Sequence, residues 1–471
     1  LDAVLSHGMS SDNMLLSVII PIPKNMKKSL NDVDNYRAIA LSSPICKILD
    51  IIILNQNEHI FESSPCQFGY KSDSSTTKCT LVATEVVNYY LQSDSTVYST
   101  LLDASKAFDR VHYGKLFEEL LSKGLCPLVC KLLLLQYTMQ QYCVRFGNIL
   151  SERFIVKNGV KQGGVLSPIL FNMYMDILLR KLQASGMGCY VGNRFAGALG
   201  YADDIMLLTP TRKAMNSFLL ICENYSREYE LMFNASKSKT VVFNSESDDM
   251  FSLQGNHIEI VQSEAHLGNF FGANSFHAQI ARNIRDLYIN FNLLLAQFSH
   301  VNVDIKYTLF KSFCLSVYGS QLWNFESELC EKFYVTWRKC VRRLFKLPQR
   351  AHCNLLHHIC EDIPIEAQLH CRFGNFLNSC LQSKNDLLKI VCNNALGNPR
   401  SNLNMSTNFV CQKYDINRNC NHLSSQVRKY VSETIDNDSA RQGTLIKDFL
   451  RMNDYQPDAN ISDIVEYLCL V

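Results

Sequence analysis

The sequence predicts an α+β fold in which central strands end in acidic residues and a mainly helical region follows. A β-rich run at 96–102 ends at Asp103, and two apolar runs, 199–201 and 205–208, flank the pair Asp203–Asp204. Apolar runs around a short polar connection are typical of buried strands joined in a hairpin. From about residue 273 to 385 the apolar spacing is helical instead.

Residues 1–95 mix β-rich and helical pieces and contain two basic residues of interest. Arg37 lies in the otherwise apolar stretch Tyr36–Leu41, and Lys24 follows the strand-like Pro21-Ile22-Pro23. A buried arginine needs an anionic partner, and a triphosphate is one, although a structural salt bridge is the alternative. Lys24 would assist in neutralising phosphate charge.

The acidic residues indicate a metal site. Adjacent carboxylates repel each other, burial adds to that cost, and a divalent cation removes both problems. Asp103, Asp203 and Asp204 would together hold two Mg²⁺ ions, with Mn²⁺ as a possible substitute and the backbone of Leu102 or Ala104 as a further ligand. Two such ions suit in-line phosphoryl transfer. An ordinary Asp-rich turn is the alternative for the pair alone.

A glycine-rich segment, 159–168, precedes the next predicted helix. Gly163 and Gly164 permit close approach of the backbone to a template base or sugar, and Gln162 would hydrogen-bond there. Ser167-Pro168 resembles a helix N-cap followed by proline, and the apolar run 169–179 predicts a buried helix. A simple turn is the alternative.

A basic segment lies at 332–350. Arg338, Arg342 and Lys346 recur every four residues and are expected to share one helix face, with Pro348 ending the helix. Such a face would follow a phosphate backbone, whereas a merely solvated face is the alternative.

Composition says less than these motifs about which partners the protein binds. The 471 residues carry a formal net charge of only +2, so a nucleic-acid partner would be met by local patches. The 19 cysteines lie among apolar residues, as expected of reduced intracellular thiols. The Cys and His residues of 352–371 match no standard zinc spacing. No apolar stretch is long enough to predict a membrane partner.

An ordered set of motifs resembles the reverse transcriptases of non-LTR (LINE-like, jockey-type) retrotransposons, over about residues 20–376. The matching segments, in chain order, are Pro21–Lys24, Asn35–Leu41, Gln67–Tyr70, Asp103–Phe108, Gly159–Pro168, Tyr201–Asp204, Asn234–Ser238 and His266–Gly272. One four-residue match would be weak, but all of them in this order are specific.

The resemblance implies a right-hand polymerase. Fingers are expected at 1–95 and 113–164, the palm with an antiparallel sheet at 96–112 and 165–272, and a helical thumb at 273–385. The C-terminal extension at 386–471 is expected to begin as a loose linker and to form short helices near 426–435 and 438–452.

Residue roles are implied in the same way. Asp103, Asp203 and Asp204 would be catalytic, Lys237 would donate a proton to the leaving pyrophosphate, and Phe108 would exclude a 2′-hydroxyl. The deoxynucleotide (dNTP) site would further include Lys24, Arg37, Gln162 and Gly163. Primer and template would contact Tyr201, Gly164, Leu267, Gly268, Arg338, Arg342 and Lys346.

The implied partners are an RNA template, a DNA primer or target-site DNA, and dNTPs, with action in the nucleus. The chain is expected to be an N-terminally truncated fragment without an endonuclease. Two alternatives stay open: a catalytically silent nucleic-acid-binding remnant, and a protein similar to group II intron maturases. The oligomeric state is not predicted.

Overall fold

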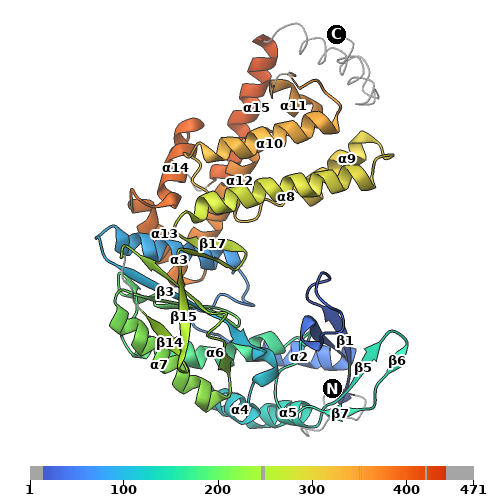
Figure 1. Ribbon diagram of the computed structural model, residues 1–471, viewed down its shortest axis with the longest axis vertical. Helices are drawn as coiled ribbons and strands as arrows, with labels where there is room; N and C mark the ends of the chain where they lie inside the picture. The colour runs from blue at the N-terminus through green and yellow to red at the C-terminus, as the bar shows by residue number, and fades with distance from the viewer. Residues whose placement is uncertain (1–13, 246–249, 350, 352, 419–421, 442–471) are drawn as a thin grey trace. The chain divides into compact units, whose positions relative to one another are not determined.

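The computed structural model describes residues 14–245, 250–349, 351, 353–418 and 422–441. The chain forms two compact units, one of residues 1–79 and 94–261 and the other of 80–93 and 262–471. The predicted α+β class, with antiparallel-rich sheets and a helical C-terminal region, is confirmed (Figure 1).

A six-stranded sheet is the centre of the first unit. Its order is β10-β11-β3-β13-β15-β14, and all neighbours are antiparallel except β13 and β15. Every residue of β3 is buried, which explains its continuous run of apolar and small polar residues. The strands are β3 (Val97–Leu102), β10 (Ala198–Tyr201), β11 (Asp204–Thr209), β13 (Lys239–Phe243), β14 (Phe251–Leu253) and β15 (Asn256–Val261).

A second sheet of the first unit is formed by β1, β2, β5, β6 and β7. β1 pairs antiparallel with β2 and parallel with β5. Its strands are β1 (Leu16–Pro23), β2 (Tyr36–Ser42), β5 (Gln141–Phe146), β6 (Ile149–Leu150) and β7 (Phe154–Ile155). Two short pairs are β4 (Ala104–Ser105) with β12 (Met232–Phe233), and β8 (Tyr190–Val191) with β9 (Arg194–Phe195).

The helices of the first unit begin at clear sequence signals. Ser43 caps α2 and is followed by Pro44, and Thr211 caps α7. The predicted buried helix after residue 168 is confirmed as α6, whose apolar side chains are nearly all buried. The helices are η2 (Val33–Asn35), α2 (Pro44–Gln56), η3 (Ala107–Arg110), α4 (Tyr113–Ser122), α5 (Pro127–Thr138), α6 (Ser167–Ala184) and α7 (Arg212–Tyr229), while α3 (Thr76–Leu91) spans the boundary at residue 80.

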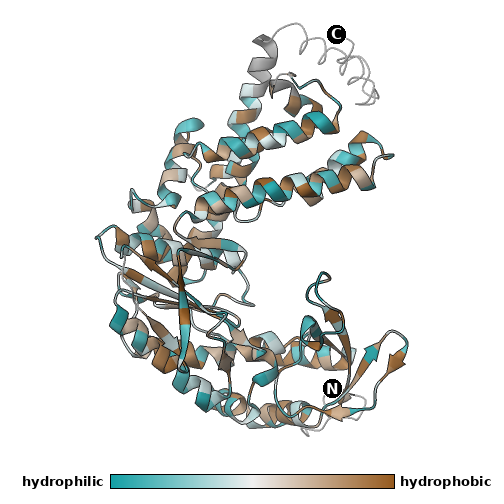
Figure 2. Ribbon diagram, in the orientation of Figure 1, coloured by the Kyte–Doolittle hydropathy of each residue, from teal (hydrophilic) through white to brown (hydrophobic). Residues whose placement is uncertain are grey.

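In its described residues, the second unit is helical apart from the β16–β17 hairpin. In Figure 2, hydrophobic and hydrophilic residues alternate along its long helices, as expected of amphipathic helices. Its elements are β16 (Ser263–His266), β17 (Asn269–Gly272), α8 (Ser275–Gln297), α9 (Val303–Leu309), η4 (Phe310–Cys314), η5 (Ser320–Leu322), α10 (Leu329–Leu344), α11 (Cys353–Cys360), α12 (Ile365–Leu381), α13 (Asp386–Gly397), α14 (Asn402–Lys413) and α15 (Leu423–Arg441).

The expectation of a loose linker after residue 386 is wrong. Asn385 caps α13 and Ser401 caps α14, so the abundant asparagine and serine residues begin helices instead of preventing them. Val391 and Val410 are buried between these helices and their neighbours. The expected helix at 426–435 lies within α15, and the part of the other expected helix after residue 441 lies outside the described residues.

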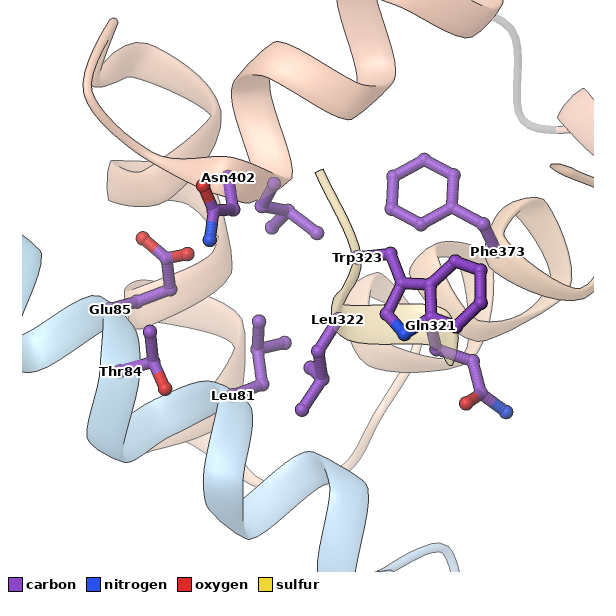
Figure 3. Close-up of a pocket in the computed structure, with 9 residues that line it drawn as sticks. Leu81, Thr84, Glu85, Gln321, Leu322, Trp323, Phe373 and Asn402 are labelled. Atoms are coloured by element: carbon purple, nitrogen blue, oxygen red, sulfur yellow. The ribbon is translucent and has the colours of Figure 1, made fainter. Parts of the chain in front are cut away.

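The described part of α3 that belongs to the second unit helps to line a small cavity, shown in Figure 3. Trp323 and Phe373 form one side of it, and Glu85 and Asn402 the other. Burial raises the pKa of Glu85, and hydrogen bonds from Ser401 and Asn88 oppose that shift. Residues 80–93 are thereby an integral part of the second unit's core.

Among the described residues, no helix has both the length and the hydropathy needed to cross a membrane.

Candidate active site

The acidic pair lies at the hairpin of β10 and β11, as predicted. Tyr201 pairs with Asp204, so Ala202 and Asp203 form the two-residue connection. Ala202 has a φ of +57°, an unfavourable conformation for a residue with a side chain. Other contacts must therefore hold this turn.

Gln67 supplies those contacts. Its side chain is fully buried, and its Oε1 accepts hydrogen bonds from the backbone N–H of Ala202 at 3.0 Å and of Gly69 at 2.9 Å. A Cβ at residue 69 would lie 2.4 Å from the nitrogen of Ala202, so only glycine permits this approach. The side chain of Asn172 on α6 donates to the Gly69 carbonyl at 2.7 Å.

Gln67, Gly69 and Asn172 are positioning residues that the sequence interpretation did not assign. In the sequence, Gln67–Tyr70 is one of the segments that resemble reverse transcriptases, with no role predicted for its single residues. Its glycine beside a buried polar residue was the available signal, but its contact with residue 202 depends on tertiary structure.

Asp103 is brought beside this turn by the sheet. Leu102, the last residue of β3, pairs with Ile205, so Asp103 and Asp204 are the next residues on adjacent strands. The Asp103 carbonyl accepts from the Asn234 N–H at 2.8 Å, and its own N–H donates to Ser238 Oγ at 3.2 Å. Asp103 therefore occupies the predicted end of the central strand.

The three carboxylates influence one another electrostatically. Burial by surrounding protein atoms, and then Asp203 and Asp103, raise the pKa of Asp204 to about 6, although its side chain still reaches solvent. Burial and Asp103 also raise the pKa of Asp203, whereas Arg37 lowers it. A divalent cation would relieve this repulsion, so the donor set fits the expected metal.

A preformed metal cage is nevertheless not present. Among the described residues, no three His, Cys, Asp or Glu side chains are arranged to hold one ion. That the three aspartates share metal ions therefore stays a prediction. Lys237 Nζ instead lies 3.7 Å from Asp103 Oδ2.

Lys237 is placed by a compact turn. Asn234 Oδ1 accepts from the backbone N–H of Ser236 at 3.1 Å and of Lys237 at 3.3 Å. The lysine side chain is largely exposed, so its ammonium is accessible to a ligand as well as to Asp103.

Phe108, in η3, is half-buried. Its ring stacks on Phe171 of α6 with centroids 4.2 Å apart, and it meets Tyr70 edge-on at 6.2 Å. The stretch after Asp103 forms β4 and the short 3₁₀ helix η3 instead of an α-helix, with Lys106 at a φ of +50° between them. Asp109 lies within η3, and so it does not begin a long helix.

The glycine-rich segment contacts both η3 and β2. The N–H of Val160 donates to the Phe108 carbonyl at 2.8 Å, and the Gln162 carbonyl accepts from the Ala40 N–H at 2.7 Å. Gly163 has a φ of +112°, and a Cβ there would lie 3.0 Å from the Ala40 carbonyl oxygen. Gln162 Nε2 donates to Asp109 Oδ1 at 3.4 Å.

The predicted cap at Ser167 is wrong by one residue. Leu166 occupies the capping position, and Ser167 is the first helical residue, buried against Tyr137 at 3.3 Å between hydroxyl oxygens. A Cβ at Gly164 would lie 2.5 Å from the Ser167 oxygen, so the glycine makes room for this serine.

Arg37 differs from its predicted environment, whereas Lys24 follows the end of β1 as predicted. Arg37 is exposed on β2, as are Ala38 and Leu41, so the expectation of a buried arginine is wrong: apolar neighbours in the sequence do not by themselves bury a strand residue. The positive charge of Arg37 nevertheless acts on Asp203, because it opposes the rise in the pKa of that carboxyl group. Lys24 is exposed, and its Nζ donates to the Asp34 carbonyl at 2.9 Å.

The predicted primer and template residues fall in both units. Tyr201, at the end of β10, is half-buried in the first unit. Leu267 and Gly268 form the turn of the β16–β17 hairpin in the second unit, with φ angles of +49° and +77°. Tyr318 donates its hydroxyl to the Leu267 carbonyl at 2.9 Å and so fixes this turn.

The three basic residues predicted to share one face of α10 do not all lie on that helix. The helix ends at Leu344, so Lys346 lies beyond it at a φ of +54°, and Pro348 comes too late to end the helix. Arg342 donates to the Ala351 carbonyl from Nε at 3.1 Å, and Arg338 forms an ion pair with Glu331.

The four-residue spacing was correct, but it could not reveal these internal partners. The basic residues exposed on α10 are instead Lys332, Lys339 and Arg343.

The described cysteines are free thiols, and all except Cys126 and Cys353 are buried. His370 is buried too, with Nδ1 2.8 Å from the Tyr414 hydroxyl, and burial lowers its pKa to about 3. His370, Cys371 and Cys380 are buried core side chains of α12.

Residues 22–274, more than half of the chain, match the family described as "Reverse transcriptase (RNA-dependent DNA polymerase)". The chain belongs to the reverse transcriptase family. The matched range contains Lys24, Arg37 and the three aspartates of the first unit, and also the turn at Gly268 of the second unit.

Relatives of this reverse transcriptase include proteins of non-LTR retrotransposons, as predicted. The "RNA-directed DNA polymerase from mobile element jockey" of Drosophila funebris is 26% identical over 64% of this chain and 35% of its own length. The Pol polyprotein of "type-1 retrotransposable element R2" from Popillia japonica is 28% identical over 47% of this chain and 31% of its own length. The chain thus spans about a third of these relatives.

Solved structures similar to this reverse transcriptase include a telomerase from Candida albicans. It is 12% identical over 91% of this chain and 67% of the telomerase chain, with a TM-score of 0.39.

Proposed function

We propose that this chain is an RNA-directed DNA polymerase of a non-LTR retrotransposon, which extends a DNA primer by copying element RNA. The observation that carries the proposal is the placement of Asp103, Asp203 and Asp204 at the ends of adjacent strands, with Lys237 and Arg37 acting on them. Carboxylates paired with nearby cations match the needs of a reaction between a primer hydroxyl and a triphosphate. The same proposal places this reaction on nuclear DNA.

Each residue has a defined task in this proposal. Arg37 and Lys24 would bind triphosphate oxygens, and Lys237 would hold a proton near the leaving pyrophosphate. Phe108, supported by Phe171, would form a wall beneath the sugar. Gln162 and Gly163, fixed against β2, would border the nucleotide.

The three aspartates would hold divalent metal, Mg²⁺ in the first instance. Bound metal would lower the pKa of the attacking hydroxyl and neutralise the leaving group. The mutual repulsion of the carboxylates supports this assignment because it leaves the site short of positive charge.

Primer extension on an RNA template with Mg²⁺ tests the proposal. The unmodified protein should extend the primer, and Asp203→Asn should abolish extension while RNA binding stays largely intact, because nucleic acid is held mainly through phosphates and stacking. Asp415→Asn, at an exposed aspartate that follows α14, is the control for the lost charge. RNA binding without any extension by the unmodified protein would favour the silent remnant instead.

A further inference from the structure

A carboxylate outside the catalytic set lies among the lysines of the candidate nucleotide site. Asp34 is in η2, the short helix that precedes β2, and its side chain is 70% exposed. Its Oδ1 lies 2.8 Å from Nζ of Lys106, the residue between β4 and η3. Lys24 donates to the backbone carbonyl of the same aspartate at 2.9 Å.

Three ammonium groups act on this one carboxylate. Lys106 is the main cause of the lowered pKa of Asp34, and Lys24 and Lys237 lower it further. Lys237 also lies 3.7 Å from Asp103. Lys106 thus pairs directly with this exposed carboxylate, Lys24 bonds the backbone of the same residue, and Lys237 acts on it from the 234–238 turn.

The loop that carries Asp34 is held by other groups. Asn35 is buried, and its side chain accepts from the Asn25 N–H at 3.1 Å and donates to the Asn25 carbonyl at 2.9 Å. Asp32 caps η2, and Tyr36 donates its hydroxyl to the Leu30 carbonyl at 2.9 Å. Among the described residues, Lys106 is the one ion-pair partner of Asp34, so the aspartate side chain is free to leave without unfolding its loop.

Charge favours such an exchange. An exposed ion pair contributes little to stability, because solvent screens it and two long side chains lose rotamer freedom. A triphosphate presents several anionic oxygens, which attract a lysine cluster more strongly than one carboxylate does.

We propose that Asp34 is an internal competitor for the incoming nucleotide: its carboxylate occupies Lys106 in the free protein, and the triphosphate displaces it and takes Lys106 as a further ligand. This inference rests on the proposed polymerase function, since it concerns the same nucleotide site. It predicts that Asp34 weakens nucleotide binding, although the residue is not itself in contact with the nucleotide.

Equilibrium binding of dTTP in Ca²⁺ tests the inference without requiring turnover. Asp34→Asn should lower the Kd for dTTP by roughly 1.5-fold to fivefold, as expected from losing one exposed competing ion pair. Binding of dTMP, which lacks the outer phosphates, should change less. Lys106→Gln should raise the Kd for dTTP.

The double variant separates competition from general charge effects. If Asp34 acts through Lys106, Asp34→Asn should tighten binding much less in the Lys106→Gln background than in the unmodified protein. Glu259→Gln is a matched control, because Glu259 is an exposed acid that pairs with Lys239 on β13, and it should leave dTTP binding unchanged.

An unchanged or weakened affinity of Asp34→Asn for dTTP would overturn the inference and would mean that the Asp34–Lys106 ion pair has only a structural role. Absence of dTTP binding in both proteins would also overturn it. Primer extension measured in parallel keeps the two proposals distinct, because tighter dTTP binding with no extension by the unmodified protein contradicts the polymerase and leaves the competition standing.

Discussion

The β10–β11 turn and helix α10 were both predicted from short sequence patterns, yet they differ in how far the structure supports them. At the turn, Gln67 and Gly69 contact Ala202 and so fix the position of Asp203 and Asp204. The pairing of β3 with β11 places Asp103 beside them. On α10, Arg338 and Arg342 use their charges within the protein. A buried strand restricts where its end residues lie, whereas a basic residue on a helix can turn to an internal partner. Position in a sheet is therefore the stronger indicator of a site.

Gly69→Ala would test the turn most severely. A methyl group there would lie 2.4 Å from the Ala202 nitrogen, so the turn and its aspartates must shift. Extension should fall by about 100-fold, as expected when reacting groups move by about 1 Å. Primer-extension rates at saturating substrate measure the effect.

Gly397→Ala is the control for this substitution, since a Cβ there meets no atom within 4 Å. Equal rates for Gly69→Ala and the unmodified protein would mean that the turn does not position the catalytic aspartates.

Phe108→Val would test whether the wall beside the turn selects the sugar. Shortening the side chain removes the ring that stacks on Phe171 and opens space for a 2′-hydroxyl. The preference for deoxynucleotides over ribonucleotides should fall by roughly 10-fold to 100-fold, the range typical of steric discrimination. The ratio of kcat/KM for the two nucleotides gives the answer, and an unchanged ratio would make Phe108 a core residue only.

Lys332→Gln combined with Lys339→Gln would test the revised basic face of α10. Both lysines are exposed, so any phosphate contacts of this helix should involve them. The slope of log affinity against log salt should become shallower by roughly one to two units. Binding titrations at several salt concentrations measure the slope, and no change would assign these lysines to a solvated surface.

Arg342→Ala would test whether this arginine stabilises the fold instead of binding nucleic acid. It removes two hydrogen bonds to the Ala351 carbonyl, and we expect a loss of about 1–2 kcal/mol in the free energy of unfolding. The salt slope should stay as in the unmodified protein. Urea denaturation gives the stability, and a full effect on the slope with none on stability would restore Arg342 to the nucleic-acid face.

The sequence predicted the central elements because their signals are local. The apolar run ending at Asp103, the hairpin around Asp203 and the buried helix α6 were read from residue periodicity and were found in place. The exposure of Arg37 and the bond from Arg342 to the Ala351 carbonyl depend on how the chain folds around them, and apolar spacing and charge do not contain that information. Asparagine-rich helices such as α14 were missed because capping residues resemble linker residues in composition.

The hydrogen bond from Ala202 to Gln67 joins residues 135 positions apart in the chain. A contact of such long range is slow to form, because a large loop must close before the interaction contributes any free energy. Segment 66–70 also pairs with Gly200, so the acidic turn cannot reach its final conformation until this distant strand edge has docked. During synthesis, segment 66–70 leaves the ribosome before the aspartates of the turn do, so Gln67 is already present when Ala202 emerges and the turn can close onto it.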